Sequence, residues 1–143
     1  MGTRLYFYLS FFFLSFFCFD LQPTLAKFPT YNVTIINALP DEALLDLRCR
    51  SKDDDLGHHT PAFRQSYSWR FRVNFLGSTL YYCSFNWIHG HLTFDAFDNR
   101  NPKLRGACGY GDERICLWTA AGDSVNLKDY STGTIILKYN WEH

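Results

Sequence analysis

Two pairs of histidines are the residues of this chain best suited to acid–base or metal chemistry. They are His58 with His59, and His89 with His91. Imidazole exchanges protons near neutral pH and binds zinc, which requires three or four ligands converging at about 2 Å. Nothing in the sequence brings the two pairs together, so solvent-exposed loop histidines are the favoured interpretation.

Three consecutive aspartates, Asp53, Asp54 and Asp55, could instead supply oxygen ligands to calcium. Calcium loops alternate their oxygen donors around a glycine turn and add a distant bidentate glutamate. The run is followed by Leu-Gly and lacks that layout, and Lys52 beside it favours ion pairing at the surface. A solvated acidic loop is therefore the favoured interpretation, and we expect no metal and no other cofactor.

The segment Ile88-His89-Gly90-His91 invites comparison with a hydrolase motif. Secreted acid ribonucleases of the T2 type carry His-Gly-Leu-Trp after an apolar stretch, and this chain departs from that pattern at His91. It also lacks the family's second histidine segment with glutamate and lysine. RNA hydrolysis needs two positioned proton-transfer groups. We therefore predict no catalytic residue and no enzymatic activity; a secreted hydrolase that depends on His89 or His91 is the alternative.

Cysteine usage indicates an exported protein with two disulfide bonds. Cys18 falls in the apolar N-terminal segment, which leaves four cysteines at intervals of 34, 25 and 8 positions: Cys49, Cys83, Cys108 and Cys116. An even number in an exported chain favours disulfides, whereas zinc sites use CxxC-like spacings. Four cysteines allow three pairings, and the spacing does not choose among them.

The N-terminal segment has the pattern of a secretory signal peptide. Residues 5–19 carry no charge over 15 positions, short of the about 20 that a membrane span needs. Thr24-Leu25-Ala26 then offers small residues at the usual cleavage spacing. We expect a signal peptide over residues 1–26 and a secreted, extracellular domain over 27–143 without direct membrane insertion. An uncleaved signal anchor is the alternative.

Charge and composition exclude two further classes of protein. The 14 Lys and Arg residues balance 14 Asp and Glu residues, and such neutrality argues against a nucleic-acid-binding protein. The aromatic content of 19% rules out disorder for the bulk of the chain. Export would also make Asn32, in Asn32-Val33-Thr34, a usable glycosylation site.

Alternation of apolar and polar residues predicts β-strands along most of the chain after residue 30. It is clearest in 66–75, where one face carries Tyr67, Trp69, Phe71, Val73 and Phe75. A turn at Leu76-Gly77-Ser78 separates this segment from 79–88, and we expect the two to form a hairpin. Further strands are expected at 31–36, 43–50, 92–97, 114–120, 124–127 and 134–141.

These elements predict an all-β fold, namely a small antiparallel β-sandwich of about seven or eight strands, disulfide-bonded. No segment shows a helical period of convincing length, and the mature chain is expected to form one domain. Three loops stand out, at 51–61, 98–106 and 109–113. The expected aromatic core consists of Trp69, Phe71, Phe85, Trp87 and Trp118.

One segment, 45–57, is specific enough to suggest a family: LDLRCR is followed by Ser-Lys-Asp-Asp-Asp-Leu-Gly. Weaker matches continue through 33–39, 67–71, 80–87 and 116–118. On these segments the mature chain resembles the plant self-incompatibility protein S1 family, also called S-protein homologues. The resemblance implies a secreted, non-enzymatic signalling or recognition protein. In some plants a member is secreted by the stigma and is thought to meet a pollen membrane receptor, whereas the roles of most homologues are open.

The resemblance therefore implies a cell-surface membrane receptor as the partner. The expected receptor-binding residues lie in two hydrophilic loops, with Asp53, Asp54, Asp55, His58 and His59 in one and Arg100, Lys103 and Arg105 in the other. Merely solvated loops are the alternative, as is a secreted defence or structural binding protein of the apoplast. The disulfide pairing we expect is Cys49–Cys116 and Cys83–Cys108.

Overall fold

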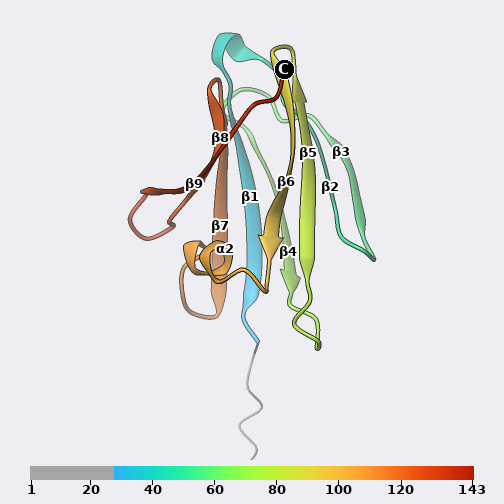
Figure 1. Cartoon of the computed structure of the whole chain (residues 1–143), viewed down its shortest axis with the longest axis vertical. Coiled ribbons are helices and arrows are strands. Elements are labelled where there is room, and N and C mark those ends of the chain that lie inside the picture. Colours follow the sequence, from blue (N-terminus) through green and yellow to red (C-terminus); the bar gives the residue numbers. More distant parts are fainter. Residues whose placement is uncertain (1–27) are drawn as a thin grey trace, which may run out of the picture.

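The computed structural model describes residues 28–143, so the predicted signal peptide at 1–26 lies outside the described residues. Residues 28–143 form two β-sheets (Figure 1), and the two sheets enclose one apolar core. The strands are β1 (Thr30–Ala38), β2 (Asp46–Arg50), β3 (Asp55–His59), β4 (Ser66–Arg72), β5 (Leu80–Trp87), β6 (Gly90–Asp98), β7 (Glu113–Ala121), β8 (Ser124–Lys128) and β9 (Ile135–Asn140). The predicted all-β sandwich is confirmed.

The two sheets differ in size and in strand direction. Sheet A has the order β4-β1-β7-β8-β9, and sheet B has the order β3-β2-β5-β6. Neighbouring strands pair antiparallel except β1 and β7, which run parallel in sheet A. The described residues hold nine strands because Asp55–His59, expected as part of a loop, pairs with β2 as an edge strand.

The hairpin expected between 66–75 and 79–88 is wrong. β4 pairs with β1 in sheet A, whereas β5 pairs with β2 and β6 in sheet B. The two apolar faces meet across the sandwich instead, where the ring centroids of Trp69 and Phe71 lie 5.6 and 4.7 Å from that of Tyr81. An alternating pattern shows which face of a strand is apolar, but two facing sheets satisfy it as well as a hairpin does.

Two short helices interrupt the strands. η1 (Pro40–Glu42) follows β1, and α2 (Pro102–Ala107) lies in the connection expected as a loop at 98–106. The Asn101 side chain accepts hydrogen bonds from the backbone N–H groups of Lys103 and Leu104, so it caps α2. Within residues 28–143, no helix is long and apolar enough to span a membrane.

The core between the sheets is aromatic. Phe85 and Trp118 are fully buried, and the indole N–H of Trp118 donates to the Ala96 carbonyl at 3.0 Å. Trp69 is also buried, whereas Phe71 and Trp87 are partly exposed at the margin of the core. The Ala96 contact satisfies this indole N–H and orients the central ring, whereas the buried Nε1 of Trp69 has no hydrogen-bond partner among residues 28–143.

Both disulfides differ from the expected pairing. Cys49 bonds Cys83, its direct neighbour in the β2–β5 register, and Cys108 bonds Cys116 across the connection between α2 and β7. The expected bonds Cys49–Cys116 and Cys83–Cys108 are wrong because β2 and β5 share sheet B, whereas β7 belongs to sheet A. Each observed bond therefore closes a local contact, and neither one links the two sheets.

Asn37 is a buried polar residue that joins three connections near the end of β1. Its side-chain amide donates to the carbonyls of Ala43 and Pro61 at 2.8 and 2.9 Å. Its carbonyl oxygen accepts the backbone N–H of Leu39 at 2.9 Å. The side chain is completely buried, so these contacts satisfy groups that water does not reach.

Candidate recognition surface at the loop end

Three connections gather at one end of the sandwich, which we call the loop end. They are the β2–β3 turn (51–54), the β4–β5 loop (73–79) and the segment between β6 and β7 (99–112), in the lower part of Figure 1. The register explains their proximity, because Arg50 pairs with both Asp55 and Tyr82, and Leu80 pairs with Asp98. The Asn99 N–H also donates to the Thr79 carbonyl at 3.0 Å. The two hydrophilic loops predicted from the sequence therefore lie at the same end.

The β2–β3 turn is built by the segment most specific to the family resemblance. The Ser51 N–H donates to the Asp54 carbonyl at 2.8 Å, and the Asp54 N–H donates to the Ser51 hydroxyl at 3.1 Å. Gly57 follows with φ +78°, a left-handed conformation that favours glycine. This geometry leaves the side chains of Lys52, Asp53 and Asp54 exposed at the turn.

Asp55 has a different environment from its two neighbours. Its carboxylate forms an ion pair with Arg48 on β2 and accepts the Gly57 N–H at 3.0 Å. The hydrogen bond from Arg48, followed by the one from Gly57, lowers the pKa of Asp55 to about 2. Asp55 therefore contributes to the cohesion of β2 and β3, and only part of its charge is available to a partner.

We predict that this ion pair persists in acid. Because the folded-state pKa of Asp55 is depressed, its contribution to stability is complete above the ordinary carboxyl pKa of about 4 and is lost as the pH falls towards about 2. An NMR titration of the Asp55 carboxyl carbon should give a midpoint near 2. In an Arg48→Gln variant the midpoint should rise towards about 4. An unchanged midpoint in that variant would contradict the assigned cause.

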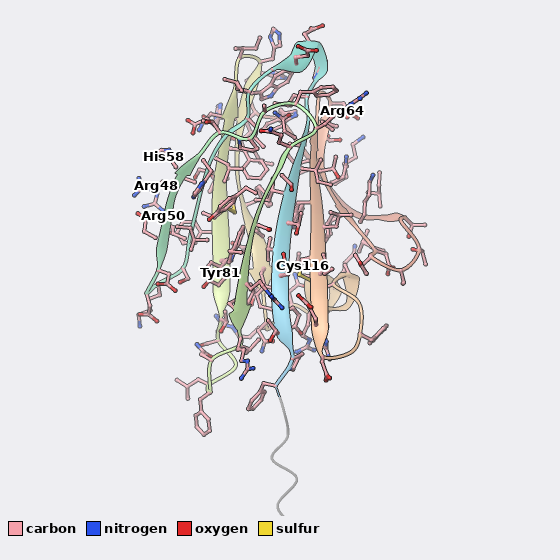
Figure 2. All side chains as sticks on the ribbon, turned by 180° about the vertical axis from the view of Figure 1, so that it is seen from behind. Arg48, Arg50, His58, Arg64, Tyr81 and Cys116 are labelled. Atoms are coloured by element: carbon pink, nitrogen blue, oxygen red, sulfur yellow. A yellow bond between two sulfur atoms is a disulfide. The ribbon has the colours of Figure 1, made fainter. Side chains whose placement is uncertain are left out.

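The two histidines of the first predicted loop lie on the edge strand β3. His58 is exposed, with Nδ1 3.4 Å from Asp46 Oδ1, and Figure 2 shows it in line with Arg48 and Arg50 along this edge. His59 points inward, stacks on Tyr67 with ring centroids 3.8 Å apart, and has Nε2 2.7 Å from the Leu56 carbonyl. His58 is thus accessible to a partner, whereas His59 packs between the edge strands β3 and β4.

Of the three basic residues of the second predicted loop, Arg100 precedes α2, and Lys103 and Arg105 lie on it. Arg100 is exposed, and its Nε lies 4.0 Å from Asp98. Lys103 is exposed on the first turn of α2. Arg105 is half-buried and donates from Nη1 to the Asn99 carbonyl at 3.0 Å. The loop end therefore carries an acidic turn on sheet B and a basic segment that includes α2.

Two further residues of the loop end, Phe75 and Leu76, were not predicted from the sequence as part of a binding surface. Phe75 was expected on the apolar face of a long strand, but β4 ends at Arg72. Both side chains are exposed at the tip of the β4–β5 loop. The turn signal at Gly77 was present in the sequence, but alternation alone did not show that β4 ends at Arg72, five residues before this glycine.

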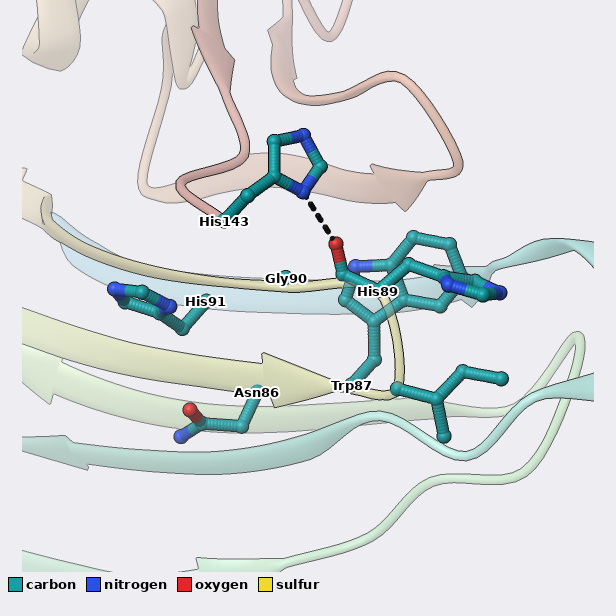
Figure 3. A pocket seen from close by; sticks show the side chains of 7 residues that line it. Asn86, Trp87, His89, Gly90, His91 and His143 are labelled. Atoms are coloured by element: carbon teal, nitrogen blue, oxygen red, sulfur yellow. Dashed lines mark hydrogen bonds between the residues drawn. The ribbon is translucent and has the colours of Figure 1, made fainter.

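The opposite end holds a hollow of about 460 Å³ at the β5–β6 turn, drawn in Figure 3. Its lining includes His89, His91 and His143, and the His89 and His91 rings lie on opposite sides of the hollow. His143 Nδ1 lies 2.8 Å from the His89 carbonyl, and His91 Nε2 lies 3.4 Å from Glu142. Across residues 28–143, no three His, Cys, Asp or Glu side chains are grouped to hold a metal ion.

Asn32 lies on β1 with its side chain on the outer face of sheet A. Its register partners are Arg70 on β4 and Ile115 on β7, and its Oδ1 accepts the Thr34 hydroxyl at 2.9 Å. The side chain is half-exposed. Glycosylation of Asn32 stays a prediction, and a glycan there would project from the outer face of sheet A near the start of β1.

Fold and surface together define a class: small disulfide-bonded β-sandwiches that carry exposed charged connections at one end. The family model described as "Plant self-incompatibility protein S1" matches residues 32–141. The chain belongs to this family, which confirms the resemblance noted in the sequence.

Relatives in Arabidopsis thaliana agree with this assignment. S-protein homolog 1 is 34% identical over 116 residues, which cover 81% of this chain and 74% of the relative. S-protein homolog 2 is 37% identical over 125 residues, which cover 85% of this chain and 76% of that relative. The chain thus shares most of its length with S-protein homologues.

A solved structure supports the fold. It represents the SPH (Self-Incompatibility Protein Homologue) proteins, described as a widespread family of small, highly stable, secreted proteins from plants. The match has a TM-score of 0.58 at 16% identity and covers 81% of this chain and 97% of the solved one. At this level of identity the likeness shows a common fold.

Proposed function

We propose that this chain is a secreted, non-enzymatic plant recognition protein that binds a cell-surface membrane receptor through its loop end. Residues 1–26 would direct export and be removed, which N-terminal sequencing of the exported protein tests. The description of SPH proteins as secreted supports the extracellular location. We expect the protein to use no cofactor and to bind no nucleic acid.

One observation carries the receptor proposal. The acidic turn with Lys52, Asp53 and Asp54 and the basic segment with Arg100 and Lys103 lie at the same end of one domain. Loops held by a rigid scaffold are common binding sites, and opposite charges on one surface favour a partner with complementary charges. The disulfides and the buried core hold the scaffold that presents these side chains.

We predict that neutralising Asp53 and Asp54 weakens receptor binding. The variant Asp53→Asn/Asp54→Asn leaves the Arg48–Asp55 ion pair intact and keeps the size of both side chains. Saturable binding to plant cell membranes should become about tenfold weaker, which corresponds to about 1.4 kcal/mol. The matched control is Asp41→Asn/Glu42→Gln, which removes two exposed carboxylates at η1, at the opposite end.

Equal binding by both variants and the unmodified protein would contradict a role for the acidic turn. Saturable binding to cell-wall material without binding to membranes would favour the alternative of an apoplastic defence or structural protein. Turnover of RNA that disappears in His89→Ala or His91→Ala variants would contradict the non-enzymatic role.

A further inference from the structure

The tip of the β4–β5 loop presents two adjacent apolar side chains to solvent. Phe75 is 94% exposed and Leu76 is 84% exposed. Single exposed apolar residues are common on protein surfaces, whereas neighbouring large ones mark interaction sites. Figure 1 shows this loop reaching below the ends of β4 and β5, away from the core.

Hydrogen bonds hold the loop in one shape. The Asn74 side chain accepts the Ser78 N–H at 2.9 Å, and the Asn74 N–H donates to the Thr79 hydroxyl at 2.7 Å. Gly77 adopts φ +67°, and its carbonyl accepts the Asn99 side-chain amide at 3.0 Å. The loop is therefore preorganised, and its exposed pair is held outward by a fixed backbone.

Two cationic side chains lie beside this apolar tip. Arg105 and Arg114 line a hollow of about 300 Å³ beside Phe75. Arg72 at the end of β4 and Lys103 on α2 carry two more positive charges at the loop end. Among residues 28–143, these four cations have no carboxylate within 4.0 Å.

The carboxylates at this end are mostly engaged or displaced to one side. Asp98 lies 4.0 Å from Arg100, and Glu113 lies 2.7 Å from Arg70. Asp112 is the one carboxylate of the 99–112 segment, against three basic residues. The acidic β2–β3 turn lies on the sheet B side. The tip itself is therefore apolar with a positive margin.

We propose that the β4–β5 tip docks peripherally on a bilayer that contains anionic phospholipids. Phe75 and Leu76 enter the boundary between headgroups and acyl chains, while Arg105, Arg114 and Lys103 contact lipid phosphates. Apolar side chains flanked by Arg and Lys are the pattern that binds such an interface. This departs from the expectation that the mature domain does not insert directly into a membrane.

The shape of the tip favours a bilayer over a protein surface. A standard protein interface buries about 800 Å² on each partner, with a broad, complementary surface. Two side chains on a projecting loop offer a small area but can enter a fluid interface without a matching pocket. The lipid contact can be tested without the receptor, because pure vesicles contain no protein.

Co-sedimentation with vesicles tests this proposal, using protein purified from plant cells that express the full chain. Binding is expected to vesicles of equal parts phosphatidylcholine and phosphatidylserine, and to weaken in high salt or with phosphatidylcholine alone. The variant Phe75→Ser/Leu76→Ser should bind at least tenfold more weakly. Because both side chains are exposed, its thermal midpoint should equal that of the unmodified protein.

The matched control is Ile88→Ser, which removes an exposed apolar side chain, 80% exposed, at the opposite end. This variant should bind vesicles like the unmodified protein. Absence of vesicle binding by the unmodified protein, or equal binding by the Phe75/Leu76 variant, would overturn the proposal. If vesicles fail but binding to protein-containing plant membranes is lost in the Phe75/Leu76 variant, the tip contacts a protein receptor, and the lipid proposal is wrong.

Discussion

Replacing Asn37 with alanine should lower the free energy of unfolding by about 3–5 kcal/mol, because three hydrogen bonds of a buried side chain are lost together. The N–H of Leu39 and the carbonyls of Ala43 and Pro61 would be left without their partner. An unsatisfied buried polar group costs about 1–3 kcal/mol. Chemical denaturation should show a lower midpoint with an unchanged slope.

The matched control for this prediction is Asn86→Ala. Asn86 lies on β5 and is exposed, so its loss should change stability by no more than about 0.5 kcal/mol. A result for Asn37→Ala within about 1 kcal/mol of that control would mean that water enters and satisfies the three backbone groups. The role of Asn37 in joining the connections near the end of β1 would then be wrong.

Removing the Cys49–Cys83 bond should be the second large effect. In the double variant Cys49→Ala/Cys83→Ala the free energy of unfolding should fall by about 4 kcal/mol, because the bond restricts a long loop in the unfolded chain. The separation of these cysteines is 34 positions, against 8 for Cys108 and Cys116. The corresponding Cys108→Ala/Cys116→Ala variant should lose about 2.5 kcal/mol by the same relation.

Denaturant titration of the two double variants measures this difference, and mass analysis of a non-reduced digest checks the pairing. The prediction would be wrong if both variants lost the same free energy of unfolding, or if the Cys108/Cys116 variant lost more. Packing in the folded state would then outweigh the entropy of the closed loop. A linked peptide that joins Cys49 to Cys116 would contradict the pairing in the structure.

Strand positions were predictable from the sequence because alternation reports which side chains face an apolar core. It identified the buried face of the 43–50 segment, which contains β2, at Leu45, Leu47 and Cys49, all completely buried. It could not identify neighbours, because a strand with one apolar face satisfies its pattern in either sheet. The expected hairpin and both expected disulfides were wrong for this same reason.

The loop end was predictable in part. Charged runs indicated the 51–55 and 100–105 segments, but their meeting at one end depends on the register of four strands. Asp55 and His59 belong to an edge strand, because pairing with β2 and stacking on Tyr67 outweigh the loop-like composition of the segment. The exposure of Phe75 and Leu76 could not be predicted, because the alternation of apolar and polar residues looks the same whether an apolar side chain lies in a core or at an exposed tip.

The parallel pairing of β1 with β7 has a consequence for the order in which the protein assembles during synthesis. Tyr31 on β1 and Arg114 on β7 are hydrogen-bonded and lie 83 positions apart in the sequence. The first strand to be synthesised therefore cannot pair with β7 until most of the chain has been made. Sheet B draws on residues 46–98 and can close around Cys49–Cys83 earlier. Until β7 emerges, β1 exposes an unpaired edge that can bind other unfinished chains. The β1–β4 pair of sheet A can form early, but sheet A is completed only after sheet B, when β7 and the strands that follow it arrive.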